Sequence, residues 1–503
     1  MSSNHEVKAA LKRYWGYDAF RPKQEEIVHN ILDGRDVCVV MPTGGGKSLC
    51  YQLPAVLQSG KTAIVISPLI ALMQDQVAQL TQMGIPAAVL NSSQSWNQQR
   101  ETERLAETGK IRLLYLSPER LAKKETLEWL GEVPVSFFAI DEAHCISEWG
   151  HEFRPDYRQL KLLRKEFPGK PISAFTASAT RHVRHDIIAQ LKLKDPGKFI
   201  ASFHRNNLNY QVMACDSKNQ EAKLLAILQK HAGSAMIVYS PTIKRVGTTV
   251  VTLREKGIAA IGYHADMGSE ERRENQERWM NDEVTVLVGT VAFGLGINKP
   301  AVRAVVHLSL PKSIEQYYQE AGRAGRDGLA SDCFLLWQKK DAGLLAYFIE
   351  QIEDREEKQR AWDRYHEVRK FAESTECRHK IICNHFGEKV AWTNCGACDV
   401  CRPAAIEQTE TVPRASRDKK KRAPSVPPSA GLNASRLAAL KQWRLERSRA
   451  DKVPAFVVLH DTALQHICSA NPSSLSALRQ TPGIGERKLT LYGDEILEVL
   501  RAN

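Results

Sequence analysis

The sequence predicts an α/β protein of two tandem lobes, each with a parallel sheet, followed by a small helical, cysteine-rich module and a separate all-α C-terminal domain. Two observations support this fold class. Up to about residue 340, short β-branched runs alternate with longer amphipathic stretches, as in parallel sheets. Beyond that point the alternation stops, and helical periodicity and clustered cysteines replace it.

Apolar runs bounded by turn residues are the expected strands, and they form two series separated near residues 203–210. The first series lies at 37–41, 62–67, 112–117, 136–141 and 172–177, and the second at 235–240, 259–264, 284–290 and 304–310. The predicted units are therefore lobe 1 at 1–205, lobe 2 at 206–340, the cysteine-rich module at 341–402, a linker at 403–432 and the helical domain at 433–503.

Composition narrows the class of protein. The chain has 503 residues and a formal net charge of +12, which favours a polyanionic partner without requiring one. No apolar run reaches the ~18 residues that span a bilayer, and the first residues do not follow the pattern of a secretory signal. We therefore expect a cytoplasmic protein, nucleoid-associated if bacterial, whose 11 dispersed cysteines are reduced apart from one cluster.

The predicted linker, 403–432, is rich in Pro, Ser, Ala and Lys. Between Arg414 and Arg422 it carries six basic residues against one acidic residue. Such a segment buries too little apolar surface to fold, so we expect a basic, disordered connection.

A phosphate-binding loop is expected in MPTGGGKS, residues 41–48, between a predicted strand and a predicted helix. Consecutive glycines let backbone N–H groups approach a triphosphate. Lys47 would reach the β- and γ-phosphates, and Ser48 would ligate Mg²⁺. The match to G-x-x-x-x-G-K-[ST] lacks the first glycine, and the alternative is a glycine turn beside a surface lysine. The expected ATP contacts in the loop are Thr43, Gly44, Gly45, Gly46, Lys47 and Ser48.

The catalytic carboxylates are expected in DEAH, residues 141–144, at the end of a predicted strand. Asp141 would hold the Mg²⁺ shell and Glu142 would polarise the attacking water. Two adjacent carboxylates at an apolar strand end are costly to desolvate, so the alternative of a solvated turn carries little weight beside the phosphate loop.

A pair of arginines in QEAGRAGRDG, residues 319–328, completes the predicted active site. Arg323 and Arg326 are three residues apart, so on a helix they would share one face and reach the cleft between the lobes. An arginine supplied across the cleft stabilises charge on the transferring phosphoryl group. By itself the string could also be a glycine-rich surface turn.

In their order and spacing these motifs resemble those of superfamily 2 helicases, and in detail those of the RecQ family of DNA helicases. The resemblance covers residues 7–402 and returns over the last 70. It also rests on WGYDAFRPKQ (15–24), SPLIALMQDQ (67–76), SPERL (117–121), CISEWGHEFRPDY (145–157), FTASAT (175–180), GYHADM (262–267) and GTVAFGLGINKP (289–300). It implies two RecA-like P-loop lobes and ATP-driven 3′-to-5′ movement along single-stranded DNA with duplex unwinding, in recombination and repair.

The resemblance also assigns roles to single residues. Tyr17 would stack on the adenine, with Arg21 and Gln24 contacting it, although Lys23 stands where glycine is common. CISEWGHEFRPDY resembles the aromatic-rich loop that couples DNA contact to hydrolysis. Stacking of bases on such aromatic faces is independent of sequence, and the alternative is core packing. The expected DNA contacts are Trp149, His151, Phe153, Arg154 and Thr290.

Four cysteines, Cys377, Cys395, Cys398 and Cys401, form C-x₁₇-C-x₂-C-x₂-C. Four thiolates suit a closed tetrahedral zinc site that contributes to folding, and the RecQ family has such a site after its second lobe. An iron–sulfur cluster is the alternative metal centre. Cys383, His379 and His385 are alternative ligands.

The last 70 residues resemble the HRDC domain found at the ends of RecQ helicases. In TPGIGERK, residues 481–488, Gly483 and Gly485 could offer backbone N–H groups to a DNA phosphate beside Arg487 and Lys488, or could form a simple turn between helices.

In the RecQ family a winged-helix domain, on the order of a hundred residues, usually precedes the HRDC domain. The predicted linker is too short to contain such a domain. Efficient unwinding is therefore less firmly expected than DNA-stimulated hydrolysis. The expected partners are single-stranded and tailed duplex DNA. The open alternatives are an ATP-switched DNA-binding or annealing factor and an RNA-directed motor.

Overall fold

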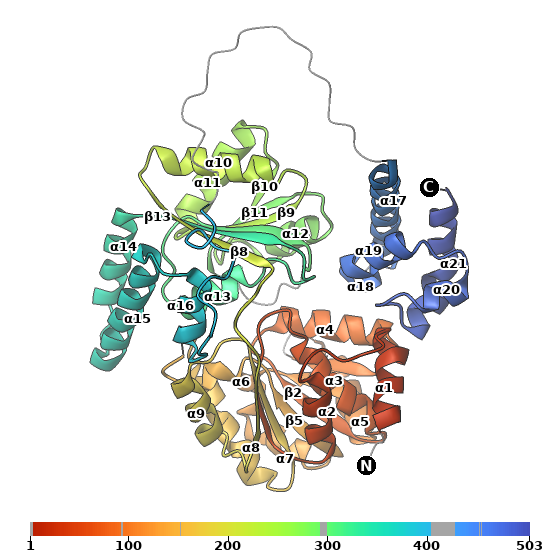
Figure 1. Cartoon of the computed structure of the whole chain (residues 1–503). Helices are drawn as coiled ribbons and strands as arrows, with labels where there is room; N and C mark the ends of the chain where they lie inside the picture. Colours follow the sequence, from red (N-terminus) through yellow and green to blue (C-terminus); the bar gives the residue numbers. More distant parts are fainter. Residues whose placement is uncertain are drawn as a thin grey trace.

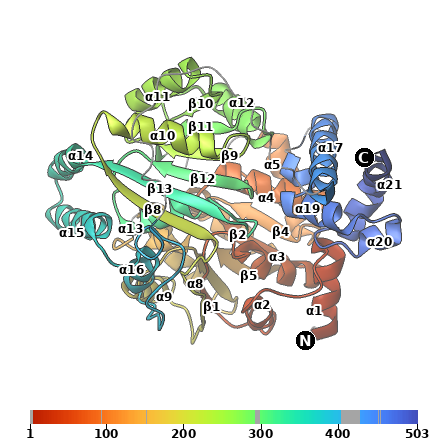
Figure 2. The same ribbon diagram turned by 45° about the horizontal axis from the view of Figure 1, so that its top comes forward.

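The computed structural model describes residues 4–91, 94–150, 152–291, 299–403, 428–451, 453 and 455–502. The two α/β lobes lie one above the other in Figure 1, with helices α14 to α16 on one side and the C-terminal helices α17 to α21 on the other. The view in Figure 2 shows the same arrangement, with the two groups of helices on opposite sides of the lobes.

Lobe 1 is a seven-stranded parallel sheet in the order β3-β4-β2-β5-β6-β1-β7. Its strands are β1 (Val37–Val40), β2 (Thr62–Ile66), β3 (Ala87–Leu90), β4 (Leu113–Leu116), β5 (Val135–Ile140), β6 (Ile172–Thr176) and β7 (Gly197–Ile200). Its helices are α1 (Asn4–Ala10), a π-helical turn (Leu11–Trp15), α2 (Gln24–Leu32), α3 (Lys47–Leu57), α4 (Ile70–Gln82), α5 (Trp96–Glu107), α6 (Pro118–Leu121), α7 (Lys124–Leu130), α8 (Lys161–Glu166) and α9 (Arg181–Gln190), with short 3₁₀ turns at Ala143–Ile146 and Pro155–Leu160.

Lobe 2 is a six-stranded parallel sheet in the order β10-β11-β9-β12-β13-β8. Its strands are β8 (Leu208–Cys215), β9 (Ala235–Tyr239), β10 (Ala260–Tyr263), β11 (Val286–Gly289), β12 (Val302–His307) and β13 (Ser331–Gln338). Its helices are α10 (Asn219–Lys230), α11 (Ile243–Glu255), α12 (Ser269–Met280) and α13 (Ile314–Ala321). Both predicted strand series are confirmed, and the chain passes between the sheets after Ile200 and before Leu208.

The strands that the sequence did not predict are β3, β7, β8 and β13. β3 and β7 are four-residue edge strands with partly exposed residues, so they lack the apolar continuity of a buried strand. β8 alternates polar and apolar side chains over residues 208–212, and β13 has polar residues at both ends. The two strands pair along their whole length at one edge of the lobe 2 sheet.

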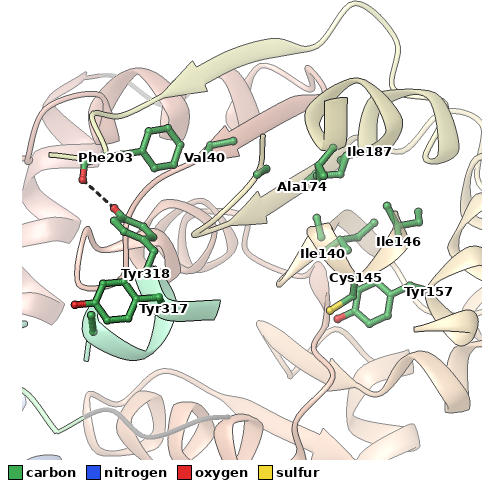
Figure 3. Packing of buried hydrophobic residues seen from close by; sticks show 14 of the residues in the cluster. Val40, Ile140, Cys145, Ile146, Tyr157, Ala174, Ile187, Phe203, Tyr317 and Tyr318 are labelled. Atoms are coloured by element: carbon green, nitrogen blue, oxygen red, sulfur yellow. Dashed lines mark hydrogen bonds between the residues drawn. The ribbon is translucent and has the colours of Figure 1, made fainter. Parts of the chain in front are cut away.

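The crossing between the lobes is packed rather than loose. The ring of Phe203 stacks on that of Phe386, with 4.3 Å between centroids, and the Tyr318 hydroxyl donates to the Phe203 carbonyl at 3.3 Å (Figure 3). On the lobe 1 side the same buried cluster includes Ile140 and Tyr157. The core therefore continues from one lobe into the other.

The cysteine-rich module consists of α14 (Lys339–Glu350), α15 (Arg355–Glu373), α16 (Arg378–His385) and the loop that follows. It begins two residues earlier than predicted. The module extends the lobe 2 sheet, because the Tyr210 amide donates to the Ala397 carbonyl at 3.2 Å and the Asp399 amide donates to the Tyr210 carbonyl at 2.9 Å.

The C-terminal domain is all helical, with α17 (Pro428–Asp451), α18 (Ala455–Val458), α19 (Asp461–Ala470), α20 (Leu475–Arg479) and α21 (Glu486–Ala502). α17 begins inside the segment predicted as linker. Residues 404–427, the rest of that segment, lie outside the described residues, and so does its predicted disorder. Within the described part of the chain, no helix is long and apolar enough to cross a bilayer.

Candidate active site

The phosphate loop joins β1 to α3, as the motif predicted. Gly44 and Gly46 have φ angles of +79° and +84°, which favour glycine. A Cβ on Gly46 would lie 2.3 Å from the Gln24 amide nitrogen, so a side chain at this position would displace Gln24. The backbone conformation therefore favours glycine here, and a side chain would also move the Gln24 amide.

Lys47 begins α3 and points into the loop, where its Nζ donates to the Met41 carbonyl at 3.1 Å. Burial lowers the pKa of Lys47, and the charges of Glu142 and Asp141 oppose that shift. Burial and the adjacent Glu142 raise the pKa of Asp141 to about 7, although Lys47 acts against this. The predicted lysine and carboxylates thus form one buried, mutually dependent group of charges.

The DEAH segment leaves β5 at the carboxyl edge of the sheet. The Tyr157 hydroxyl donates to the Asp141 carbonyl at 2.9 Å, and the Asp141 amide donates to the Ile66 carbonyl at 2.8 Å. Glu142 has a φ of +47°, a left-handed conformation that is unfavourable for a residue with a side chain. The surrounding contacts hold this strained residue beside Asp141.

Arg323 and Arg326 come from lobe 2 and line the same cavity as the phosphate loop. The expectation that they lie on one helix is wrong, because α13 ends at Ala321 and both arginines occupy the turns that follow. Gly325, between the two arginines, has a φ of +56°, and its amide donates to the Val302 carbonyl at 3.0 Å instead of continuing a helical pattern. The turn nevertheless brings both guanidinium groups into the cleft.

The backbone of Arg326 packs against the phosphate loop. A Cβ on Gly44 would lie 3.4 Å from the Arg326 Cα. Burial, together with the neighbouring charges of Arg323 and Arg205, lowers the pKa of Arg326 to about 9. Several cations are thus gathered where a triphosphate would supply the balancing negative charge.

Arg205, which the sequence analysis did not identify, links both lobes at this point. Its guanidinium donates to the Thr43 carbonyl at 2.8 Å in lobe 1 and to the Gly325 carbonyl at 2.9 Å in lobe 2. A second bridge joins the Gln319 amide to the Ser178 hydroxyl at 2.7 Å. Nothing near Arg205 in the sequence signals this role, because its partners lie more than a hundred residues away in either direction.

The predicted adenine contacts line the same cavity, and two of them lie against the phosphate loop. Gln24 donates to the Gly46 carbonyl at 3.1 Å, Arg21 donates to the Gly44 carbonyl, and Tyr17 is a half-buried lining residue. Lys23 has a φ of +70°, which explains why glycine suits this position.

The cavity between the lobes has a volume of about 390 Å³. The phosphate loop, both carboxylates, Tyr17 and both arginines line it together, so the structure assembles residues that are up to 309 positions apart in the sequence (17 to 326). His460 and Thr462 of the C-terminal domain also line it, which the sequence analysis did not predict.

The C-terminal domain reaches the cavity because its PGIG turn docks on lobe 1. The Gly483 amide donates to the Gly16 carbonyl at 3.3 Å, and a Cβ on Gly485 would lie 2.6 Å from the Tyr14 carbonyl oxygen. Lys488 is buried, which lowers its pKa to about 8. Of the two readings of this turn, the structure therefore favours a packed turn over a phosphate contact.

The aromatic-rich loop lies beside the active site, after the DEAH segment. Trp149 is 52% exposed, its ring centroid lies 4.7 Å from that of His182, and the Arg360 guanidinium lies 5.5 Å from its ring centre. Phe153 is half-buried under Arg158, and Arg154 donates to the Pro68 carbonyl at 3.4 Å. The exposure of Trp149 argues against the core-packing alternative for this residue.

The two remaining predicted DNA contacts are Thr290 and His151. Thr290 follows β11 in lobe 2, where its amide donates to the Tyr263 carbonyl at 3.2 Å, and it does not line the nucleotide cavity. His151 lies outside the described residues. So do residues 292–298, which make up most of the GTVAFGLGINKP motif that contains Thr290.

The four predicted metal ligands, Cys377, Cys395, Cys398 and Cys401, meet at one point, with all sulfur atoms within 4.8 Å of one another. Zn–S bonds of about 2.3 Å in a tetrahedron place sulfur atoms about 3.8 Å apart, so this donor set fits a zinc ion. The alternative ligands are engaged elsewhere. His379 Nε2 lies 3.0 Å from the Leu208 carbonyl oxygen, and His385 lies 2.7 Å from Glu315.

The fold and cavity define a class of protein: two RecA-like lobes with the phosphate loop in one and the facing arginines in the other are the architecture of superfamily 2 helicases. Solved structures of that class share the fold. The helicase MrfA bound to DNA and AMPPNP has a TM-score of 0.54 at 20% identity, covering 69% of this chain and 52% of that one. Helicase Lhr of Mycobacterium smegmatis has a TM-score of 0.52 at 18% identity, covering 67% and 48%.

Family models narrow the class further. The DEAD/DEAH box helicase model matches residues 21–186, the helicase conserved C-terminal domain 219–328, the RecQ zinc-binding model 339–402 and the HRDC domain 433–500. The chain is also 42% identical over 393 residues to the ATP-dependent DNA helicase RecQ of Haemophilus influenzae and 41% identical over 399 residues to that of Bacillus subtilis. These alignments cover 78% and 79% of this chain, and 63% and 67% of the relatives.

This chain belongs to the RecQ family. It spans somewhat less than two thirds of the length of the Haemophilus influenzae relative.

Proposed function

We propose that this protein is an ATP-dependent DNA helicase that moves 3′ to 5′ along single-stranded DNA, using ATP hydrolysis between its two lobes to unwind duplexes. The observation that carries the proposal is the cavity in which Lys47 and the Asp141–Glu142 pair of lobe 1 face Arg323 and Arg326 of lobe 2. The names of the RecQ relatives and of the DNA-bound structural neighbours support DNA as the polymer.

ATP would bind with its adenine against Tyr17 and its phosphates in the loop of residues 43–48. There Lys47 meets the β- and γ-phosphates while backbone N–H groups surround them. Ser48 and Asp141 would hold Mg²⁺, which would neutralise charge on the phosphates. Glu142 lies beside Asp141 and would orient the attacking water and accept its proton.

Arg323 and Arg326 would stabilise the charge that develops on the transferring phosphoryl group. They belong to lobe 2, whereas the nucleotide rests on lobe 1, so the rate of hydrolysis depends on the closeness of the lobes. Arg205 contacts the phosphate loop and the arginine turn together and would transmit that dependence. Closure and hydrolysis are therefore coupled, as a translocating motor requires.

DNA would reach this cycle through the aromatic-rich loop. Trp149 is exposed for stacking on a base, and the segment behind it is tied to the DEAH strand because the Arg154 amide donates to the Cys145 carbonyl at 2.9 Å. His151, Phe153 and Thr290 complete the proposed DNA contacts. Movement of this loop on DNA binding would shift the residues around Glu142.

The proposal is tested by measuring ATP hydrolysis with single-stranded DNA, with single-stranded RNA and without nucleic acid, and then strand separation on duplexes with a 3′ or a 5′ tail. We expect stimulation by DNA and separation of the 3′-tailed duplex. Stimulation by RNA alone would indicate an RNA motor. DNA-stimulated hydrolysis with strand annealing and no separation would indicate an ATP-switched binding factor.

The four-cysteine cluster is proposed to hold one structural zinc ion that fastens the module to lobe 2. Cys398 is fully buried, and its neighbours Ala397 and Asp399 make the backbone bonds to Tyr210 at the sheet edge. Asp399 also forms an ion pair with the buried Arg378 at 3.0 Å. The ion would therefore stabilise the junction between the module and lobe 2 rather than take part in chemistry.

Replacing Cys398 with serine is expected to remove the metal and lower the melting temperature, because a structural zinc site contributes to folding directly. Elemental analysis of the purified chain should give one zinc per wild-type molecule and a large deficit in the variant. Cys383→Ser is the matched control, since this buried cysteine lies outside the cluster and should leave zinc content unchanged. Iron with visible absorbance in the wild type would contradict the zinc assignment.

A further inference from the structure

Within the described residues of lobe 1, the large apolar side chains that are exposed are Ile70, Trp96, Trp149 and Ile200. Each lies at or just after the carboxyl end of a parallel strand, at the edge of the sheet that faces the cleft. Ligands of open parallel sheets bind at this edge. Trp96 is the most exposed of the four, at 70%, and none of the motifs accounts for it.

Trp96 is held in a fixed position. It opens α5, where Ser95 and Gln98 form a capping box. Arg120, from α6 after the neighbouring strand β4, ties this helix down by donating to Gln99 at 3.0 Å and pairing with Glu103 at 3.2 Å. The exposed indole therefore sits on a rigid support, as a binding residue requires.

A cation accompanies the indole. The Arg100 guanidinium, one helical turn further along α5, lies 5.3 Å from the centre of the Trp96 ring. Arg100 is exposed and, among the described residues, has no carboxylate partner, whereas Arg104 on the same helix pairs with Glu101. An aromatic face beside a free guanidinium is the combination with which proteins hold single-stranded nucleic acid.

The position also suits the polymer proposed above. β3, which precedes Trp96, and β5, which precedes Trp149, are three strands apart in the sheet, or roughly 15 Å at the usual strand spacing. Both aromatics emerge at the same edge. A protein partner is disfavoured because an isolated aromatic offers far less than the contiguous apolar surface of a stable interface.

We propose that Trp96 and Arg100 form a second contact for single-stranded DNA on lobe 1, in which a base stacks on the indole and Arg100 meets an adjacent phosphate. This inference rests on the proposed function, because it assumes that single-stranded DNA crosses the cleft-facing edge of lobe 1.

The test measures the affinity of the full chain for fluorescent oligothymidine by anisotropy. Trp96→Ala should weaken binding about tenfold, while Trp96→Phe, which keeps an aromatic face, should stay within about threefold of wild type. Arg100→Gln should reduce the slope of log Kd against log salt concentration by about one phosphate contact. Tyr347→Ala is the control, since Tyr347 is also exposed, at 61%, but lies on α14, across the molecule from α5 (Figure 1).

A scan with single abasic positions in the oligonucleotide separates stacking from a structural effect. At one position, loss of the base should weaken binding to the wild type but add no loss for Trp96→Ala. Equal affinities of wild type and Trp96→Ala, or equal abasic profiles, would overturn this inference. A wild type that neither binds single-stranded DNA nor responds to it in ATP hydrolysis would instead overturn the proposed function.

Discussion

Replacing Lys47 with alanine is expected to abolish ATP hydrolysis, lowering kcat by about 10³-fold or more with and without DNA. Lys47 is the buried cation of the phosphate loop, and its ammonium lies among Asp141, Glu142 and the Met41 carbonyl. Without it, the γ-phosphate loses its charge partner and the raised pKa of Asp141 rises further, because Lys47 is the largest of the influences that lower it. Steady-state phosphate release measures the loss.

Binding of single-stranded DNA should persist in Lys47→Ala, because the proposed DNA contacts lie on other loops. The fold should persist as well, since the substitution removes a cation whose burial is unfavourable on its own. Lys61→Ala, a change at an exposed lysine before β2, is the matched control and should hydrolyse ATP as the wild type does. Robust turnover by Lys47→Ala would remove the phosphate loop from the proposed active site.

Replacing Arg326 with alanine is the second large effect that we expect, a fall in kcat of about 10³-fold or more. Its backbone packs against Gly44 of the opposite lobe, so its guanidinium is supplied across the cleft to the nucleotide on lobe 1. The affinity for a non-hydrolysable ATP analogue should change much less than kcat, because the charge that Arg326 stabilises develops only during phosphoryl transfer. Comparing analogue binding with single-turnover hydrolysis separates the two.

Arg326→Lys tests geometry against charge. A lysine keeps the positive charge but loses the planar fork that can hold two phosphate oxygens, so only partial recovery of turnover is expected. Arg273→Ala is the control from the same lobe, because Arg273 is exposed and its ion-pair partners among the described residues are Glu270 and Glu277 on its own helix. If Arg326→Ala turned over ATP at the wild-type rate, hydrolysis would not depend on the closeness of the lobes.

Most of the strands that sequence reasoning recovered share one property. β1, β2, β5 and β9 are buried along their whole length, so hydrophobicity marks them clearly. The strands that it missed include β7, which is short and half-exposed, and β8, in which polar and apolar side chains alternate over residues 208–212. β13 was missed although residues 333–337 form an apolar run. Pairing with neighbours stabilises such strands, and a local pattern carries no information about those neighbours.

The residues of the active site also fall into those that a local sequence pattern predicts and those that it does not. The phosphate loop and the DEAH segment are local designs, because the glycines, the lysine and the carboxylates act through atoms a few residues apart. The arginine turn was only half predicted: its residues were identified, but α13 ends at Ala321, and Gly325, with a φ of +56°, lies in the turn between the two arginines. Arg205 was missed because its contacts are with backbone carbonyls of distant segments.

The sequence by itself determined the chemistry available to this protein: a triphosphate loop with its lysine, paired carboxylates at a strand end and four thiols spaced for one metal ion. These features need only short-range geometry. The tertiary structure decided which of them meet. It brought the arginines to the phosphate loop, docked the PGIG turn against Gly16 and left Trp96 exposed at the sheet edge. Such outcomes depend on the packing of segments hundreds of residues apart, where burial and exposure are properties of the whole fold.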